Sequence, residues 1–377
     1  MRLGNKLNVR RLVGILFLLF TLVFYSGNGL AASWQQNSTA GMSTEYDSNP
    51  TLSPAYPGSV LRALFDPNYT LIGRVGVNEL RSSFAIHMER SSNVYLSEDR
   101  NDPRVFLDWK HPSETGEFGI SATYNQMATR LAEGDISGPG YIPSTRVSRL
   151  MSGRWNSSLS ERSTLSANAS YEGVFYMGGT YTDYITRSGD IMFKYDWSEL
   201  NAASLKITHS DYAPAAGDLP SNTTNYVVAW DWRASDELEG NLQVGKYMIS
   251  EITNTTTGRQ FSASIRYAGQ RARFGLNAGR QVIPSGYGGF VLVDQANANW
   301  SYALSDHSTA GIDLIWQRNQ YAIKTINRNP GAWLQNELNP FWNLRTYYLH
   351  RTSEESGISS ASSNIIGISL VYTNDDF

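Results

Sequence analysis

From about residue 38 to the C-terminus, the chain alternates apolar and polar side chains in stretches of roughly ten residues separated by polar turns. The alternation is clearest in 191–197, 226–233, 261–267 and 310–317. Because successive side chains of a strand point to opposite faces, each stretch predicts a strand with one apolar and one polar face. A water-soluble sandwich would show the same pattern, so the solvent has to be inferred from other features.

Two kinds of connection alternate along the chain. Short polar turns lie at 111–116, 158–163, 198–201, 234–239, 268–271 and 305–308. The connections of the other parity are generally longer and richer in Gly and Pro, and they lie at 47–67, 92–102, 128–144, 213–222, 284–289 and 352–362. Short turns on one rim and long loops on the other are typical of an outer-membrane barrel.

Strands placed between these connections predict an all-β fold, a single transmembrane antiparallel up-and-down β-barrel of about 18 strands. No sustained 3.6-residue period is present, so no stable helix is expected. The region 320–342 is ambiguous because Asn329-Pro330 and Asn339-Pro340 interrupt it, and proline suits strand edges or turns. If this region is one long loop, the barrel has 16 strands. The expected spans are 38–47, 68–77, 81–91, 103–111, 116–127, 145–157, 163–176, 185–197, 202–212, 223–233, 239–251, 258–268, 271–282, 289–303, 308–319, 331–341, 343–351 and 363–373.

The N-terminus has the features of a secretory signal peptide over residues 1–32, which leaves 33–377 as the barrel. A basic front precedes an apolar run from Leu12 to Tyr25, and Gly29-Leu30-Ala31 fits a small-x-small cleavage site. The apolar run is short for a membrane span, although an uncleaved anchor is the alternative. The chain has no cysteine, which excludes disulfides, thiolate sites and a lipoprotein anchor. An exported chain without disulfides favours the bacterial periplasm or outer membrane, and we expect the outer membrane of a Gram-negative bacterium.

Composition supports a membrane barrel. Aromatic residues make up 12% of the chain, with 22 Tyr and 10 Trp, while the mean hydropathy is −0.35. Amphipathic rings are expected at the two membrane interfaces around a polar lumen. Several aromatics precede the short turns and predict a girdle on that side: Trp109, Trp155, Trp197, Trp232, Tyr267, Trp300 and Tyr302. Net charge is only −3 without a basic run, so nucleic acid is not an expected partner.

The alternation assigns residues to two faces. The expected lipid-facing residues are Phe193, Tyr195, Trp197, Trp230, Trp232, Phe261, Ile265, Leu314 and Trp316. The expected lumen-lining residues are Glu45, Arg74, Glu89, Arg104, Phe106, Asp108, Arg154, Lys194, Asp196, Lys206, Asp231, Arg233, Arg266, Arg273, Asp313 and Tyr348. An Arg or Lys at the lipid-facing midplane would cost about 2–4 kcal/mol, which favours this assignment of faces.

The charged lumen residues have two readings. They form ion-pair ladders that hold the sheet in register, or they form a polar track for a passing solute. Phe106 and Tyr348 are the aromatic candidates for stacking on sugars. A barrel of 16–18 strands leaves an aqueous channel, so we expect a weakly ion-selective pore unless loops 47–67 or 128–144 fold inward.

Catalytic and metal chemistry are not indicated. The five histidines include His111 and His307 in short turns and His209 at lipid-facing parity, and neither His87 nor His350 has a neighbouring motif. No His, Asp or Glu cluster has ligand spacing. We therefore predict no enzyme, no cofactor and no metal site.

The segment Thr44-Glu45-Tyr46-Asp47-Ser48-Asn49-Pro50-Thr51-Leu52-Ser53 resembles the start of mature proteins of the β-barrel porin type 2 family. The turns at 155–163 and 197–201 are also similar to turns of that family. Its members often accompany exopolysaccharide export genes. The resemblance therefore implies an outer-membrane pore for secretion or passage of an exopolysaccharide, with a periplasmic polysaccharide export protein as a partner. Outer-membrane lipid and the barrel-assembly machinery are the other expected partners.

Three alternatives stay open. The barrel is a general diffusion porin for small polar solutes, or it is a non-conducting structural or adhesive barrel acting through its extracellular loops, or the chain is a secreted soluble β protein. The C-terminus departs from the usual barrel pattern. Ile366, Ile368, Leu370 and Tyr372 set an even frame, whereas Phe377 is odd, so the last residues contain a bulge or form an overhang.

Overall fold

The computed structural model describes residues 32–55, 57–132, 144–178, 181–215, 217, 219–320, 324–357 and 360–374. The predicted signal peptide, most of loop 128–144 and Phe377 lie outside these residues. The elements are β1 (Ala32–Asp47), β2 (Val60–Val75), β3 (Asn78–Ser91), β4 (Arg100–Pro112), β5 (Gly116–Ala128), α2 (Thr129–Ala132), β6 (Thr145–Ser160), β7 (Ser163–Met177), β8 (Tyr184–Ser198), β9 (Asn201–Pro214), β10 (Ser221–Arg233), β11 (Leu238–Glu251), β12 (Thr255–Ala268), β13 (Ala272–Ser285), β14 (Gly289–Ala303), β15 (Ser308–Gln320), β16 (Lys324–Asn339), β17 (Trp342–Glu355) and β18 (Ala361–Asn374). Within the described ranges, no helix is long and apolar enough to cross a bilayer.

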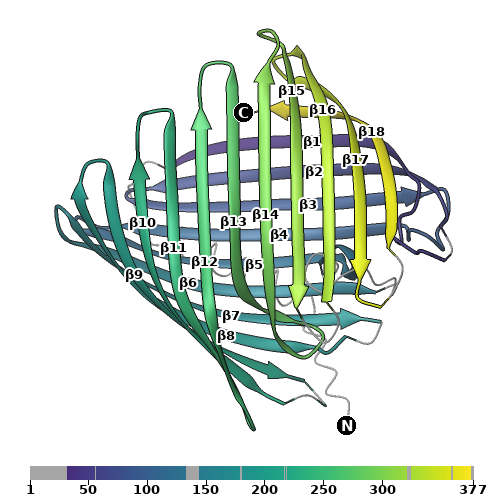
Figure 1. The fold of residues 1–377 in the computed structure, drawn as a ribbon. Helices are drawn as coiled ribbons and strands as arrows, with labels where there is room; N and C mark the ends of the chain where they lie inside the picture. Colours follow the sequence, from purple (N-terminus) through teal and green to yellow (C-terminus); the bar gives the residue numbers. More distant parts are fainter. Residues whose placement is uncertain are drawn as a thin grey trace.

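The strands form one closed antiparallel sheet of 18 strands (Figure 1). Each strand pairs with its neighbours in sequence, and β1 closes the sheet by pairing with β18 from Ser38↔Asn374 to Asp47↔Ile365. The predicted 18-strand barrel is therefore confirmed. Closure leaves no free outer edge strand, and a barrel of this size has room for water inside.

The 16-strand alternative is wrong because β16 continues through Pro330. Leu314 of β15 pairs with Pro330, whereas the ladder to β17 lacks pairs between Arg328↔Thr352 and Gly331↔Leu349. Proline has no N–H to donate, so it interrupts pairing on one side without ending the strand. Pro340 instead occupies the turn between β16 and β17.

The predicted loop 47–67 is too long, because β2 already begins at Val60. The prediction counts residues 60–67 as part of the loop. Residues 60–67 lie in the strand. Pairing to β3 begins at Arg62↔Ser91 and is interrupted between Phe65↔Met88 and Asn68↔Ala85. The connection that remains, 48–59, joins β1 to β2 at what we call the long-loop rim.

The opposite end, the short-turn rim, carries the turns 76–77, 113–115, 161–162, 199–200, 234–237, 269–271, 304–307 and 340–341. Aromatic side chains cluster on the outer face beside these turns. Trp300 stacks on Tyr302 with ring centroids 6.3 Å apart, and Trp342 lies 5.0 Å from Tyr372. This arrangement fits an aromatic girdle at a membrane interface.

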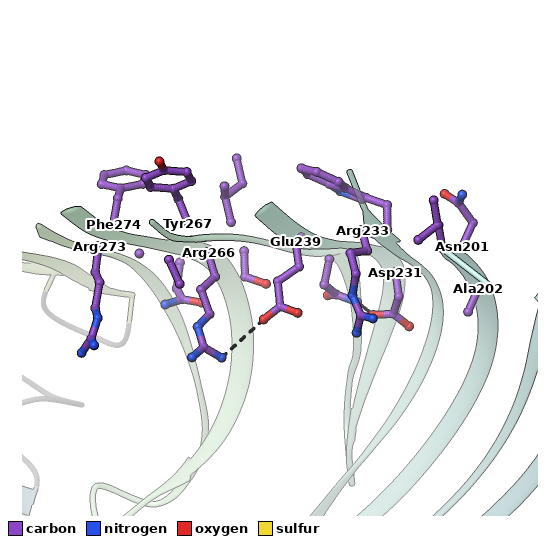
Figure 2. Close-up of a pocket in the computed structure, with 18 of the residues that line it drawn as sticks. Asn201, Ala202, Asp231, Arg233, Glu239, Arg266, Tyr267, Arg273 and Phe274 are labelled. Carbon is purple, nitrogen blue, oxygen red and sulfur yellow. Dashed lines mark hydrogen bonds and ion pairs between the residues drawn. The ribbon is translucent and has the colours of Figure 1, made fainter. Parts of the chain in front are cut away.

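Cross-strand pairing assigns the two faces of the wall, since directly paired residues share a face. The ladders place eight of the nine residues of the expected lipid-facing set on the outer face, where Phe193, Trp230 and Leu314 are exposed. The ninth, Trp197, lies at the register shift between Asp196 and Ser198, has no ladder partner among the described residues and is exposed. Figure 2 shows the alternation directly: Tyr267 and Phe274 point to one side of the sheet, and Arg266 and Arg273 point to the other.

Candidate pore

The short-turn half of the lumen contains a cavity of about 1530 Å³ lined by β8–β16, which we call the vestibule. Seven predicted lumen residues line it: Lys194, Asp196, Asp231, Arg233, Arg266, Arg273 and Asp313. Glu239 also lines it, although the sequence reading treated this residue as part of a turn. Figure 2 shows Arg233, Glu239, Arg266 and Arg273 projecting to the cavity side of the wall.

Acidic and basic side chains of the vestibule are partly paired. Lys194 Nζ lies 3.0 Å from Asp196 Oδ1, and Arg266 Nη1 lies 3.4 Å from Glu239 Oε1 (Figure 2). Asp231 accepts a hydrogen bond from Asn241 Nδ2 at 2.6 Å rather than pairing with Arg233. Among the described residues, neither Arg233 nor Arg273 has an acidic partner within 4.0 Å. Their guanidinium groups are available to a solute.

Ion pairs also lie on the lumen face of the wall formed by β2–β6. Arg154 binds both carboxylate oxygens of Asp108, at 2.7 and 3.0 Å, and Arg74 Nε lies 2.8 Å from Glu79 Oε2. On the opposite side of the lumen, Lys206 Nζ lies 3.3 Å from Asp190 Oδ1.

Three more cations share the lumen face of β3 and β4: Arg81, Arg104 and Lys110. The described part of the chain places no acidic partner within 4.0 Å of them. Phe106 also lies on this face, paired with Ser83 and Thr123.

A buried network occupies the lumen face near the long-loop rim at the seam of β1 and β18. The fully buried Asp47 carboxylate accepts hydrogen bonds from Arg62 Nη2 at 3.0 Å, from Arg351 Nη2 at 2.8 Å and from the Ser363 hydroxyl. Arg62 also pairs with Glu45, and Tyr347 donates its hydroxyl proton to Glu45 Oε2 at 2.8 Å. The charges in this network neutralise one another and link neighbouring strands of the wall.

Glu45 and Glu89 lie on the lumen face of the wall, but both are covered. The Glu89 side chain is 3% exposed and accepts a hydrogen bond from Ser97 in the connection after β3. Asn49, in the connection after β1, binds the Ser362 carbonyl through Nδ2 at 3.1 Å. The ends of these two connections turn inward over the network, which the alternation of the strands alone does not show.

Tyr348 is a wrong assignment. It pairs with Ala332 and Ile366 on the outer face and is exposed there. Two consecutive tyrosines gave both parities an aromatic ring, and the apolar frame of β18 decides which one faces out, since a strand's partner fixes its register. Tyr347 is the ring on the lumen side.

The hairpin of β13 and β14 leaves the wall near the long-loop rim. The ladder between β12 and β13 stops at Phe261↔Arg280, whereas β13 and β14 remain paired to Ser285↔Gly289. Figure 1 shows β13 and β14 curving away from β12 at this end. We call the segment 281–293 the constriction hairpin. Gly288 and Gly289 have φ of 98° and 105°, which glycine adopts without strain.

The tip of the constriction hairpin is anchored on the wall formed by β7–β9. The Tyr212 hydroxyl donates to the Ser285 carbonyl oxygen at 3.1 Å, and the Thr182 N–H donates to the Gly286 oxygen at 2.8 Å. Tyr212 lies in a buried cluster with Val174 and Tyr184, against which Phe290 packs. The hairpin therefore narrows the lumen near the long-loop rim. The sequence marked 284–289 only as a Gly- and Pro-containing connection.

Within the described residues, no group of three or more His, Cys, Asp or Glu side chains could hold a metal ion. His87 Nδ1 contacts Asp66 Oδ1 at 2.6 Å, and His350 Nδ1 contacts Asn364 Oδ1 at 2.8 Å. These contacts join neighbouring strands.

A comparison with protein-family models and with curated proteins finds no match. Solved structures do match. OpdK of Pseudomonas aeruginosa, an outer membrane protein solved with vanillate, has a TM-score of 0.53 and 11% identity over 90% of this chain and 99% of its own. OccK2 of the same organism, solved in complex with glucuronate, has a TM-score of 0.50 and 10% identity over 90% and 98%.

The FrpB iron transporter of Neisseria meningitidis has a TM-score of 0.50 and 11% identity over 89% of this chain, which spans only 64% of FrpB. At such identities the likeness is one of fold. The closed sheet and these neighbours define the fold as an 18-stranded antiparallel β-barrel of the kind found in these outer-membrane proteins.

Proposed function

We propose that this protein is a channel in the outer membrane of a Gram-negative bacterium that passes small hydrated solutes and prefers anions. The observation that carries the proposal is the state of the lumen charges. Every described carboxylate that faces the lumen from a strand interior, apart from Asp231, lies within 4.0 Å of an Arg, Lys or His side chain. Among the described residues that face the lumen from the strands, five cations lack such a partner: Arg81, Arg104, Lys110, Arg233 and Arg273.

Paired charges largely cancel for a solute several ångströms away, whereas unpaired cations attract anions and donate hydrogen bonds to them. The unpaired cations lie on two separate parts of the wall, β3–β4 and β10–β13. A passing carboxylate or phosphate would therefore meet cationic donors on both. Glucuronate and vanillate are ligands of OccK2 and OpdK, respectively. For this protein, those structures support only the choice of small organic anions as test solutes.

The constriction hairpin favours small solutes over a polymer. Its tip is held by two backbone-directed hydrogen bonds and a buried aromatic cluster, so a fixed segment crosses the lumen near one end. Interiors of folded proteins are close-packed, and such a segment yields only at the cost of its contacts.

Passage of an exopolysaccharide, with a periplasmic export protein as partner, is the second proposal. The vestibule favours it, because its wall offers amide and hydroxyl groups that exchange hydrogen bonds with sugars: Asn241, Asn277, Asn299, Ser264 and Ser301. A chain could then leave only if the constriction hairpin detached from Tyr212. The exported, signal-bearing form and insertion by the barrel-assembly machinery belong to both proposals.

The experiment is solute entry into liposomes that contain the purified protein, with a series of sugars and sugar acids from one to six residues. The small-solute channel predicts fast entry of monosaccharides, faster entry of glucuronate than of glucose, and a sharp fall for the longer members. Equal entry rates across the series would favour the polymer conduit. No entry of any solute would leave a structural barrel.

A further inference from the structure

The outer face of the barrel has an uneven distribution of charge. Between the short-turn rim and the middle of the strands, the outward positions of the described residues carry no Asp, Glu, Lys or Arg. Toward the long-loop rim, outward cations appear. Arg149 and Arg187 are two of them, on β6 and β8, and the Arg149 guanidinium lies 5.2 Å from the centre of the Phe175 ring. The two ends of the lipid-facing surface therefore differ in chemistry.

The most unusual pair is Lys246 of β11 and Arg259 of β12. They are direct cross-strand partners, on the same outward face as Tyr226. Both are exposed, and within the described part of the chain neither has an acidic partner within 4.0 Å. Like charges directly opposite each other destabilise a sheet. An anion bound between the two side chains would remove this repulsion.

Apolar side chains continue the site toward the middle of the barrel. Val244 and Phe261 are the next outward pair on the same two strands, and both are exposed, as is Val228 on β10. Arg259 lies eight residues from Tyr267 of the aromatic girdle along β12, which is roughly 26 Å of strand. A tilted transmembrane strand crosses the bilayer core in about 9–11 residues. Lys246 and Arg259 thus lie near the boundary opposite the girdle.

The nearby carboxylate does not occupy this site. Asp294 is bound by Arg280 Nε at 2.6 Å and by Arg318 Nε at 2.9 Å, so its charge is already compensated. The seam next to Arg259 supplies additional polar groups, because no ladder pair is present between Thr255–Gln260 of β12 and the described residues of β13. Backbone amides at a sheet edge are suitable donors to an anion.

We propose that Lys246 and Arg259 bind a phosphate group of an outer-leaflet glycolipid, whose acyl chains lie along Val228, Val244 and Phe261. Arginine and lysine both suit phosphate, and the apolar surface begins one residue pair away. The proposal rests on the outer-membrane location given under the proposed function. It does not require that the lumen conducts, so the two can fail separately.

The test is native mass spectrometry of the purified full chain in detergent, with bisphosphorylated lipid A added at increasing concentration. The wild type should retain lipid A, and the double variant Lys246→Gln/Arg259→Gln should retain at least tenfold less. Lipid A stripped of its phosphates should bind the wild type as weakly as intact lipid A binds the double variant. The matched control is Arg81→Gln/Arg104→Gln, which removes two cations from the lumen face and should bind lipid A as the wild type does.

Folding is checked by the mobility shift of unboiled samples, which both double variants should keep. Added inorganic phosphate at millimolar concentration should not displace the lipid, since the acyl chains contribute to binding. Equal retention of lipid A by the wild type and the Lys246/Arg259 variant would overturn the proposal, as would equal binding of the phosphate-free lipid. Unchanged conductance of the Lys246/Arg259 variant is expected, and its loss would show that the pair acts on the pore instead.

Discussion

Asp47 and Arg351 are 304 residues apart in the sequence, yet Arg351 Nη2 donates to Asp47 Oδ2 at 2.8 Å across the strand that lies between them. Asp47 belongs to β1 and Arg351 to β17, with β18 in the middle, so this contact spans the seam where the barrel closes. The Asp47 side chain is fully buried. The seam is thus fastened by charge as well as by the β1–β18 ladder.

Replacing Asp47 should destabilise closure of the barrel. Asp47→Leu leaves Arg62 and Arg351 without their common carboxylate, and removal of one partner from a buried ion pair costs about 3–5 kcal/mol. We expect a clearly lower urea concentration at the midpoint of unfolding. Unfolding is monitored by the gel mobility of unboiled samples. Asp236→Leu, an exposed position in a short turn, should leave the midpoint nearly unchanged. A midpoint equal for both variants would show that the network does not fasten the seam.

The two faces of β12 should respond differently to the same charge. Ile265 pairs with Leu276 on the outer face and is exposed, whereas Ser264 pairs with Asn241 and Asn277 on the lumen face. An Arg on the lipid face costs about 2–4 kcal/mol at the membrane midplane and less toward the interfaces. Ile265→Arg, two residues from the girdle residue Tyr267, should therefore destabilise the barrel by less than this midplane cost, and Ser264→Arg should be tolerated. The measurement is the folded fraction in lipid vesicles over a denaturant series. Equal losses would contradict the assignment of faces.

Shortening the constriction hairpin should widen the channel. Replacing residues 283–291 by Asn-Gly lets Val282 and Leu292, which are already paired, continue into a two-residue turn that suits a hairpin. Single-channel conductance in planar bilayers should rise, because the segment that reaches Tyr212 is removed. The control replaces Ile252 and Thr253, in the exposed turn between β11 and β12, by Asn-Gly. An unchanged conductance of the shortened hairpin would mean that it does not limit flow.

The milder variant Tyr212→Phe removes the hydroxyl that donates to the Ser285 carbonyl oxygen and keeps the ring. A neutral hydrogen bond contributes about 0.5–1.5 kcal/mol, which is too little to free the tip while Phe290 and Tyr184 remain packed. We expect a similar mean conductance with more frequent fluctuations in current recordings. If the fluctuations match those of the wild type, the bond does not hold the tip.

Local periodicity predicted most of the fold, because side chains two residues apart lie on the same face of a strand and reveal which face is apolar. The alternation of short turns and longer connections predicted the up-and-down topology, because such connections join strands that are neighbours in both the sequence and the sheet. Errors arose where the local signal was ambiguous. Pro330 suggests a break in the sequence but interrupts pairing on only one side of its strand. Residues 60–67 are predicted as loop although they belong to β2. Tyr347 and Tyr348 gave both parities a ring, and only the partner strand β18 resolves them.

The site needed contacts that no local pattern contains. Tyr212 and Ser285 meet across 73 residues, and nothing around either residue marks the other as its partner. The parity of the charged residues indicates which side chains enter the lumen, but not which carboxylates are already neutralised. Asp108 pairs with Arg154, 46 residues away, whereas Arg104 has no carboxylate partner within the described part of the chain. The proposed anion preference of the lumen rests on that difference.

The central claim is that unpaired cations set the ion preference of the channel, and the zero-current potential across a planar bilayer in a tenfold KCl gradient tests it most directly. The wild type should give a potential of the sign that reports chloride as the more permeant ion. Arg81→Gln/Arg104→Gln/Lys110→Gln should move the potential toward zero or past it, and Arg149→Gln on the outer face should leave it unchanged. A cation-selective wild type, or a triple variant with the wild-type potential, would contradict the account.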